Sequence, residues 1–110
     1  MIEIKPINTN RMNTVQMVVT EGTDVLGSVT LYLQETNADL SELKTTDALD
    51  FSLLYGLGKA ALNYADLHGA KTATCHDDRM ADFVKTLRFV KNGDVWTLTL
   101  EGYFESGCHA

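Results

Sequence analysis

Two cysteine-histidine pairs and one glycine-lysine motif are the parts of this sequence whose residue types suggest chemistry. The pairs are Cys75-His76 and Cys108-His109, and the motif is Gly-Leu-Gly-Lys at residues 56–59. Thiol and imidazole groups bind zinc, or act as nucleophile and base. A glycine-rich turn followed by lysine holds a phosphate group when it opens a helix. The elements that carry these residues decide whether either chemistry is available.

The glycine motif falls inside a predicted helix. From about Asp50 to His68 the apolar residues follow the period of a helix, and Gly69 ends it. In a helix that begins near Asp50 the motif lies almost two turns from the start, where each N–H group already bonds the carbonyl four residues back. A phosphate needs free N–H groups at the helix N-terminus. The motif therefore predicts close packing of this helix against its neighbours, not phosphate binding.

Cys75 ends a short predicted strand, 71–75, and precedes a second predicted helix. That position can lower the pKa of a thiol, but Asp77 and Asp78 follow directly and their negative charges oppose the shift. Asp77 or Asp78 is expected to cap the helix. A buried structural cysteine is the favoured interpretation, with a thiol-dependent role for Cys75 or Cys108 kept as a third hypothesis.

Neither cysteine-histidine pair forms a dyad, because adjacent residues on an extended strand point to opposite faces. The last predicted strand runs antiparallel to residues 71–75 and carries Cys108 away from Cys75. This argues against a disulfide and against a zinc site between them, so no metal is expected. A cluster of His68, Cys108 and His109 remains an alternative to a mobile tail at residues 105–110.

Three tyrosines are further candidates, as proton donors: Tyr55, Tyr64 and Tyr103. Aromatic residues at such spacings usually pack against a core. Tyr103-Phe104 follows the last predicted strand and is expected to cover an apolar edge.

The composition favours a single acidic domain. The 110 residues carry a formal net charge of -6 with a pI near 4.8, and the basic residues are scattered singly. This excludes a basic patch for nucleic acid or an anionic membrane surface. No apolar run is long enough to span a bilayer and the N-terminus lacks the apolar core of a signal peptide, so we expect a cytoplasmic protein. One domain over residues 1–104 is predicted.

The elements are predicted in the order β β β β α β α β β. Turn residues mark hairpins at Glu21–Asp24 and Asn92-Gly93. Antiparallel strands come first, followed by crossovers that should be right-handed and join parallel neighbours. The predicted fold class is α/β, more precisely α+β, with a mixed sheet of six to seven strands, an antiparallel N-terminal arm and two helices on one face.

The other face of this sheet is expected to be bare and hydroxyl-rich. Its candidate residues alternate with apolar ones and are Gln16, Thr20, Ser28, Thr30, Tyr32, Thr72, Thr74, Thr97 and Thr99. A threonine-rich face tolerates water, although a second copy or another protein would also cover it.

Local patterns add a resemblance to this order of elements. Four segments resemble the successive elements of one known family. The hairpin with Gly27 is similar to its early antiparallel arm, and residues 40–45 are similar to its fourth strand. Residues 57–69 are similar to its central helix and closing glycine, and residues 77–89 are similar to its last helix and aromatic residue. Together they cover nearly the whole chain. The sequence resembles the GNAT superfamily of acyl-CoA N-acyltransferases, with the family's first two helices missing between Ile7 and Val15.

The resemblance implies a cofactor loop and an acid that this sequence does not supply. The family's Gln/Arg-x-x-Gly-x-Gly/Ala loop falls on residues 49–54, where Leu49 takes the cationic or amide position and Asp50 adds negative charge beside a pyrophosphate. The family's tyrosine acid falls on Val84, which cannot protonate a thiolate. The glycine before the aromatic residue falls on Arg88.

Two functions follow from the resemblance. The first is a degenerate GNAT-like binding or interaction module without efficient acetyl transfer, acting as a homodimer or with a protein partner. The alternative is an active N-acetyltransferase that binds acetyl-CoA or CoA and holds the pantetheine through the backbone of residues 43–45. In either case the candidate cleft comprises Leu43, Lys44, Thr45, Leu49, Asp50, Phe51 and Ser52.

Overall fold

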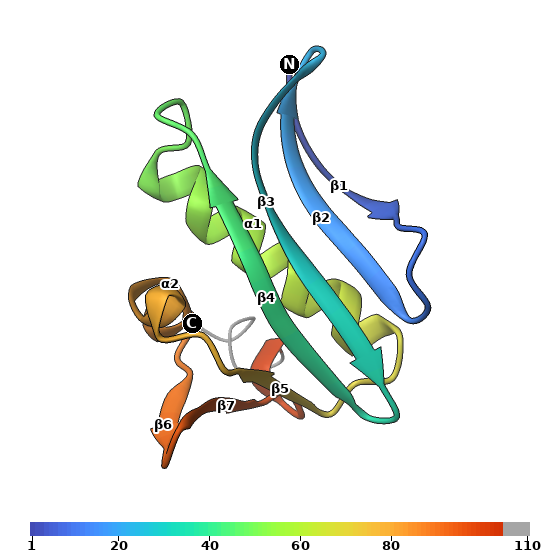
Figure 1. Cartoon of the computed structure of the whole chain (residues 1–110), viewed down its shortest axis with the longest axis vertical. Coiled ribbons are helices and arrows are strands. Elements are labelled where there is room, and N and C mark those ends of the chain that lie inside the picture. Colours follow the sequence, from blue (N-terminus) through green and yellow to red (C-terminus); the bar gives the residue numbers. More distant parts are fainter. Residues whose placement is uncertain (105–110) are drawn as a thin grey trace.

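The computed structural model describes residues 1–104 and contains seven strands, two α-helices and one 3-10 turn (Figure 1). The strands are β1 (Ile2–Asn8), β2 (Thr14–Glu21), β3 (Asp24–Gln34), β4 (Asn37–Thr45), β5 (Thr72–Cys75), β6 (Val90–Asn92) and β7 (Val95–Thr99). The helices are α1 (Phe51–Leu67) and α2 (Ala81–Thr86), and the 3-10 turn η1 (Asp78–Met80) leads into α2. The predicted order of elements and the mixed sheet are confirmed.

The strands form one sheet in the order β1-β2-β3-β4-β5-β7-β6. All neighbours are antiparallel except β4 and β5, which are parallel from Asn37–Thr72 to Leu40–Cys75. The prediction that each crossover joins neighbouring strands is wrong for the second crossover, because β7 lies between β5 and β6. The tight turn after Asn92 sends β7 back along β6, and its other edge pairs with β5.

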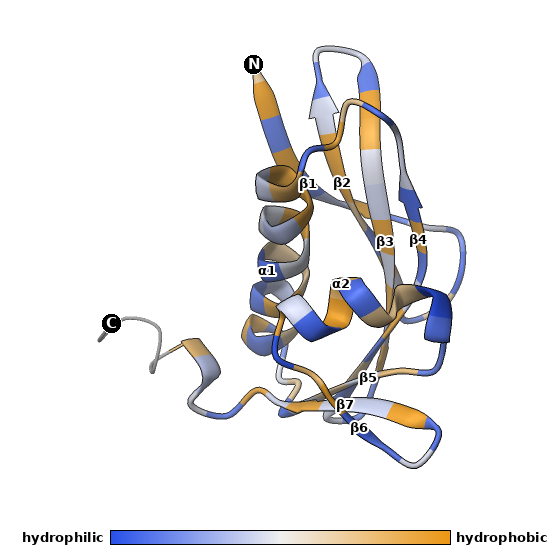
Figure 2. Ribbon diagram, turned by 90° about the vertical axis from the view of Figure 1, so that its left-hand side faces the viewer, coloured by the Kyte–Doolittle hydropathy of each residue, from blue (hydrophilic) through white to orange (hydrophobic). Residues whose placement is uncertain are grey.

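Both helices pack on the same face of the sheet, as predicted. Figure 2 shows α1 on one side of β2, β3 and β4. Val29 and Leu31 of β3 are fully buried in one cluster with Leu57 and Ala61 of α1. Alternation along β3 therefore directs its aliphatic residues toward the helices.

Helix α1 begins and ends where the sequence predicts. The Asp50 side chain caps its N-terminus, and Gly69 adopts a left-handed backbone with φ of 94° just beyond its end. The glycine motif lies inside the helix. A Cβ atom on Gly58 would lie 2.6 Å from Cδ1 of Leu87, so this glycine lets α1 approach the residue that follows α2.

No helix within residues 1–104 covers the opposite face of the sheet. Even so, Thr20, Ser28 and Thr30 are only 7%, 2% and 3% exposed, so the expectation of a face open to water is wrong at these three residues. Arg11, in the loop between β1 and β2, pairs with Glu42 of β4 at 3.1 Å and so reaches across β3. No helix in this part of the chain is long and apolar enough to cross a membrane.

Candidate functional site

Strands β4 and β5 part after the pair Leu40–Cys75, which opens a gap in the sheet. At this point β4 bulges, because its register with β3 shifts and Glu42 takes a left-handed backbone with φ of 51°. The gap contains a cavity of about 200 Å³ lined by Glu42, Leu43, Asp77, Arg79 and Met80. The bulge and the end of β5 thus form the two walls of a small cleft.

The carboxylates at this cleft already have cationic partners. The Arg79 guanidinium donates to both oxygens of Asp77, at 3.1 and 3.0 Å, and its backbone N–H donates to Oδ1 at 2.9 Å. The side-chain hydrogen bond from Arg79 is the main cause that lowers the pKa of Asp77. Glu42 is paired with Arg11. Each charge in the cleft is therefore balanced by a local partner.

The start of α1 is closed by the chain's own groups. Oδ1 of Asp50 accepts a hydrogen bond from the backbone N–H of Leu53 at 2.8 Å. The carboxylate thus occupies the positive end of the helix dipole, where an anion would bind. Phe51 is 66% exposed and its ring stacks near Tyr55, with centroids 6.4 Å apart.

The other predicted cleft residues lie in different surroundings. Leu43 lines the cavity, whereas Lys44, Thr45 and Ser52 are exposed. Leu49 turns toward β3, and its Cδ2 lies 2.6 Å from the place that a Cβ atom on Gly27 would occupy. This close approach explains the glycine in β3.

Cys75, the last residue of β5, is fully buried. Its Sγ lies 3.8 Å from Sδ of Met80 and 3.8 Å from the carbonyl oxygen of Asp77. Burial is the main cause that raises the pKa of the Cys75 thiol. Cys108 lies outside the described residues, as does any cluster formed with it. The surroundings of Cys75 suit a packing role rather than a nucleophile.

A polar chain between β4 and β5 was missed by the sequence reasoning. Thr72 donates to Asn37 at 2.8 Å and Asn37 donates to Thr74 at 3.0 Å. Thr74 and the His76 ring then both meet Oδ1 of Asp39, at 2.8 and 2.9 Å. The sequence signal that could have predicted this chain of hydrogen bonds is the polar residue at every second position of both strands.

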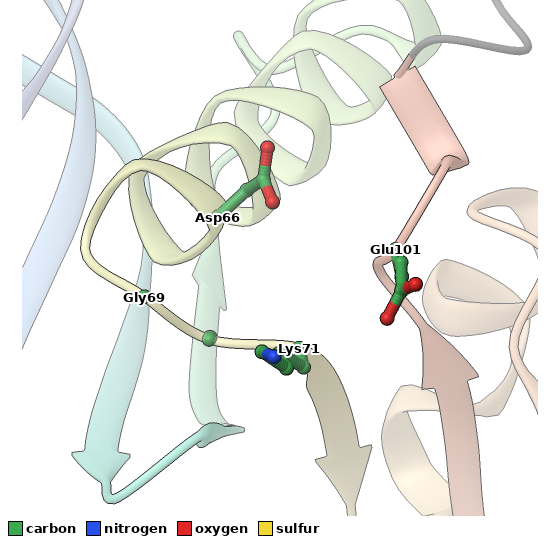
Figure 3. Close-up of a pocket in the computed structure, with 5 residues that line it drawn as sticks. Asp66, Gly69, Lys71 and Glu101 are labelled. Atoms are coloured by element: carbon green, nitrogen blue, oxygen red, sulfur yellow. The ribbon is translucent and has the colours of Figure 1, made fainter.

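A second cavity, of about 300 Å³, lies beyond the C-terminus of α1 (Figure 3). It is lined by Asp66, Gly69, Ala70, Lys71 and Glu101. Asp66 comes from the last turn of α1, and Glu101 follows β7. Within residues 1–104 no group of three or more histidine, cysteine or acidic residues is arranged to hold a metal.

Comparison with solved structures finds the same fold in many acetyltransferases. A spermidine N-acetyltransferase from Vibrio cholerae, solved with CoA and spermine, matches with a TM-score of 0.68 and 14% identity, over 84% of this chain and 69% of that chain. An aminoglycoside 6′-acetyltransferase type Ii matches with a TM-score of 0.68 and 13% identity, over 81% and 70% of the two chains. The chain has the GNAT acetyltransferase fold.

The GNAT fold is also found in a tandem GNAT protein from the clavulanic acid biosynthesis pathway, with a TM-score of 0.61 and 19% identity over 73% of this chain and 29% of that chain. No family model and no curated protein matches the sequence. These identities are too low to carry activity across, so the comparison supports the fold alone.

The structure shows the surroundings of two residues at which the sequence differs from the GNAT pattern. Val84, which the resemblance aligned with the family's acid, is fully buried. Arg88, which the resemblance aligned with the family's glycine, has φ of 76°, a left-handed backbone that favours glycine. A residue other than glycine therefore adopts this left-handed backbone at position 88, at a cost in conformational energy.

Proposed function

We propose that this chain is a binding module built on the GNAT fold, degenerate as an acetyltransferase and without efficient acetyl transfer. The observation that carries the proposal is the hydrogen bond from the Leu53 N–H to the Asp50 carboxylate. It fills the helix N-terminus with an anion that belongs to the protein. A cofactor with a pyrophosphate would have to displace that anion or bind beside it.

The charges around this turn support the same conclusion. Residues 43–52 contain two aspartates, Asp47 and Asp50, and one lysine, Lys44. A polyphosphate therefore meets net negative charge where it needs donors and cations. The aliphatic side chain of Val84 supplies no proton to a leaving thiolate at the position of the family's acid.

Titration calorimetry with acetyl-CoA, and in parallel with CoA, tests the proposal. We expect no heat of binding to the folded protein at millimolar ligand, and binding in the micromolar range would overturn it. Asp50→Asn keeps a capping oxygen and removes the charge, and Asp47→Asn is the matched control. Any binding gained by Asp50→Asn alone would identify the Asp50 charge as the block.

We also propose that the binding partner of the module is a second copy of the chain, in the cytoplasm, through the sheet face opposite the helices. The lack of a covering helix on that face within residues 1–104 supports this, together with the half-exposed ring of Tyr32. Sedimentation at two concentrations should show a dimer that Tyr32→Lys weakens. Phe51→Lys, on an exposed ring at the start of α1, is the control. A monomer at both concentrations would leave a different protein as the partner.

The cleft between β4 and β5 favours a second candidate, an active N-acyltransferase. Its cavity of about 200 Å³ lies beside the bulge of β4, where the backbone of residues 43–45 is available to a pantetheine arm. Such contacts use backbone groups and do not depend on side-chain identity. Release of free CoA thiol from acetyl-CoA in the presence of primary amines, abolished when the protein is omitted, would establish this activity.

A further inference from the structure

Three aromatic rings surround the ammonium group of Lys59 on the flank of α1. Its Nζ lies 4.4 Å from the ring centroid of Tyr103, 5.1 Å from that of Phe104 and 5.7 Å from that of Tyr55. The three rings, of Tyr55, Tyr103 and Phe104, are referred to below as the aromatic cage. It shares no residue with the cleft between β4 and β5.

The rings are held by contacts that do not involve Lys59. Tyr55 stacks against Phe51 one turn earlier on α1. Tyr103 and Phe104 meet edge to face, with centroids 4.9 Å apart and an angle of 85° between the rings. The Tyr103 hydroxyl donates to the carbonyl of Leu87 at 3.0 Å, which anchors its ring beyond α2. The cage therefore has its shape whether or not the lysine is present.

The chemistry of the cage selects a positive charge. The negative face of an aromatic ring attracts cations within about 6 Å, and quaternary ammonium groups are recognised by cages of this kind. Within residues 1–104 no carboxylate forms an ion pair with Lys59. The rings are thus the groups that hold its ammonium, although a primary ammonium is strongly hydrated and a poor match for them.

We propose that the aromatic cage is a binding site for an alkylated ammonium group, and that Lys59 is its internal occupant. A quaternary ammonium gives up its weak hydration at less cost than Lys59, while the flexible lysine stem lets the Lys59 ammonium return to water. The net charge of -6 on the chain favours the approach of a cation. The proposal holds whether or not the chain binds CoA.

The neighbouring cavity gives the rest of such a ligand a place to lie. Asp66 is two helical turns beyond Lys59 on the same side of α1, and Glu101 is two residues before Tyr103. Figure 3 shows the chain passing from Glu101 into the short turn beside α1. The cavity of about 300 Å³ is thus lined by residues from α1 and from the segment after β7, the two parts of the chain that also carry the cage.

Choline is a suitable probe, with 3,3-dimethyl-1-butanol as its neutral isostere. We expect Lys59→Ala to bind choline about tenfold more tightly than the wild type, because the internal occupant is gone. Binding is followed by nuclear magnetic resonance at constant ionic strength. Lys85→Ala is the matched control, because Lys85 contacts a single ring, that of Trp96, at 5.5 Å. Equal binding of choline and the isostere to Lys59→Ala, or no binding of choline, would overturn the proposal.

A measurement on the wild type keeps the test independent of any variant. The side-chain methylene protons of Lys59 should show ring-current shifts, and saturating choline should remove them. Ring-current shifts that persist at choline concentrations that saturate Lys59→Ala would contradict displacement. Tyr103→Leu, made in the Lys59→Ala background, should abolish choline binding, whereas Tyr103→Phe keeps the ring and should retain it.

Discussion

At two places on α1, its first turn and its flank, a position that could bind a ligand is occupied by a charged group of the protein itself. The two groups are held in different ways. At the first turn the Asp50 carboxylate caps the helix and Leu49 packs over Gly27. On the flank, the ammonium of Lys59 stands at the end of a flexible stem between rings that other contacts hold. The Asp50 carboxylate is part of the turn that begins α1, whereas the Lys59 ammonium can leave its position without any change in the backbone.

This difference means that the first turn of α1 no longer offers a binding site, whereas the flank of α1 offers a site that Lys59 occupies. Removing the cap would leave a backbone N–H at the helix end without its partner, so a ligand would have to replace a bond that the fold itself uses. Displacing Lys59 breaks no hydrogen bond recorded in the structure of residues 1–104 and leaves the rings in place. We therefore expect changes at the first turn to alter stability, and changes on the flank to alter binding.

Leu49→Ala should have the largest effect on stability. The Leu49 side chain is partly buried against the core and fills the space over Gly27, so its truncation leaves a cavity that costs about 2 kcal/mol. Urea unfolding measures the change. Leu67→Ala removes the same atoms from a residue that is 74% exposed and should stay within about 0.5 kcal/mol of the wild type. Equal costs for the two variants would mean that Leu49 does not seal the first turn.

Asp50→Ala should cost about 1 kcal/mol, because the Leu53 N–H loses its acceptor. Asp50→Asn keeps an oxygen in the same place and should recover most of that loss in urea unfolding. Asp47→Ala, in the same loop, has no such bond in the structure of residues 1–104 and serves as the control. If Asp50→Asn and Asp50→Ala were equally destabilised, charge and not capping would stabilise this end of α1.

The sequence was sufficient where local residues decide the structure. Asp50 and Gly69 fix the two ends of α1 through a capping side chain and a left-handed backbone. The hairpins predicted from the turn residues around Gly22 and Gly93 are present, and these glycines have φ of 61° and 65°. Cys75, for which a buried structural role was the favoured interpretation, is fully buried.

Contacts between distant residues were beyond the reach of that reasoning. The aromatic cage joins α1 to a turn after the last strand, so no local pattern indicates that Tyr55 and Tyr103 share one cation. The position of β7 between β5 and β6 depends on which free edge the last hairpin pairs with. Of the residues predicted for the candidate cleft, only Leu43 lines the cavity beside the bulge of β4.

Lys59→Met should change stability less than either first-turn variant, by about 0.5 kcal/mol, because cation–π contacts at partly exposed sites are weak. Methionine keeps an unbranched apolar chain over the rings and removes the charge. Lys85→Met, at a contact with one ring, is the control for a generic loss of positive charge. A loss of 2 kcal/mol or more from Lys59→Met alone would make the lysine a structural part of the flank and not a replaceable occupant.

Loss of the exposed ion pair Asp77–Arg79 should have the smallest effect on stability. Like the other two, this charged group has a partner within the protein, but the pair is open to solvent at the cleft between β4 and β5. Because Arg79 lowers the pKa of Asp77 in the folded state, the unfolded chain binds this proton at a higher pH than the folded chain does. The resulting stabilisation is present above the unfolded pKa of Asp77 and is lost as the pH falls through its folded pKa. We expect urea unfolding of Asp77→Asn between about pH 5 and pH 3 to show a slightly shallower loss of stability than the wild type. A steeper loss in Asp77→Asn would mean that the pair destabilises the fold and is retained for a ligand of the cleft.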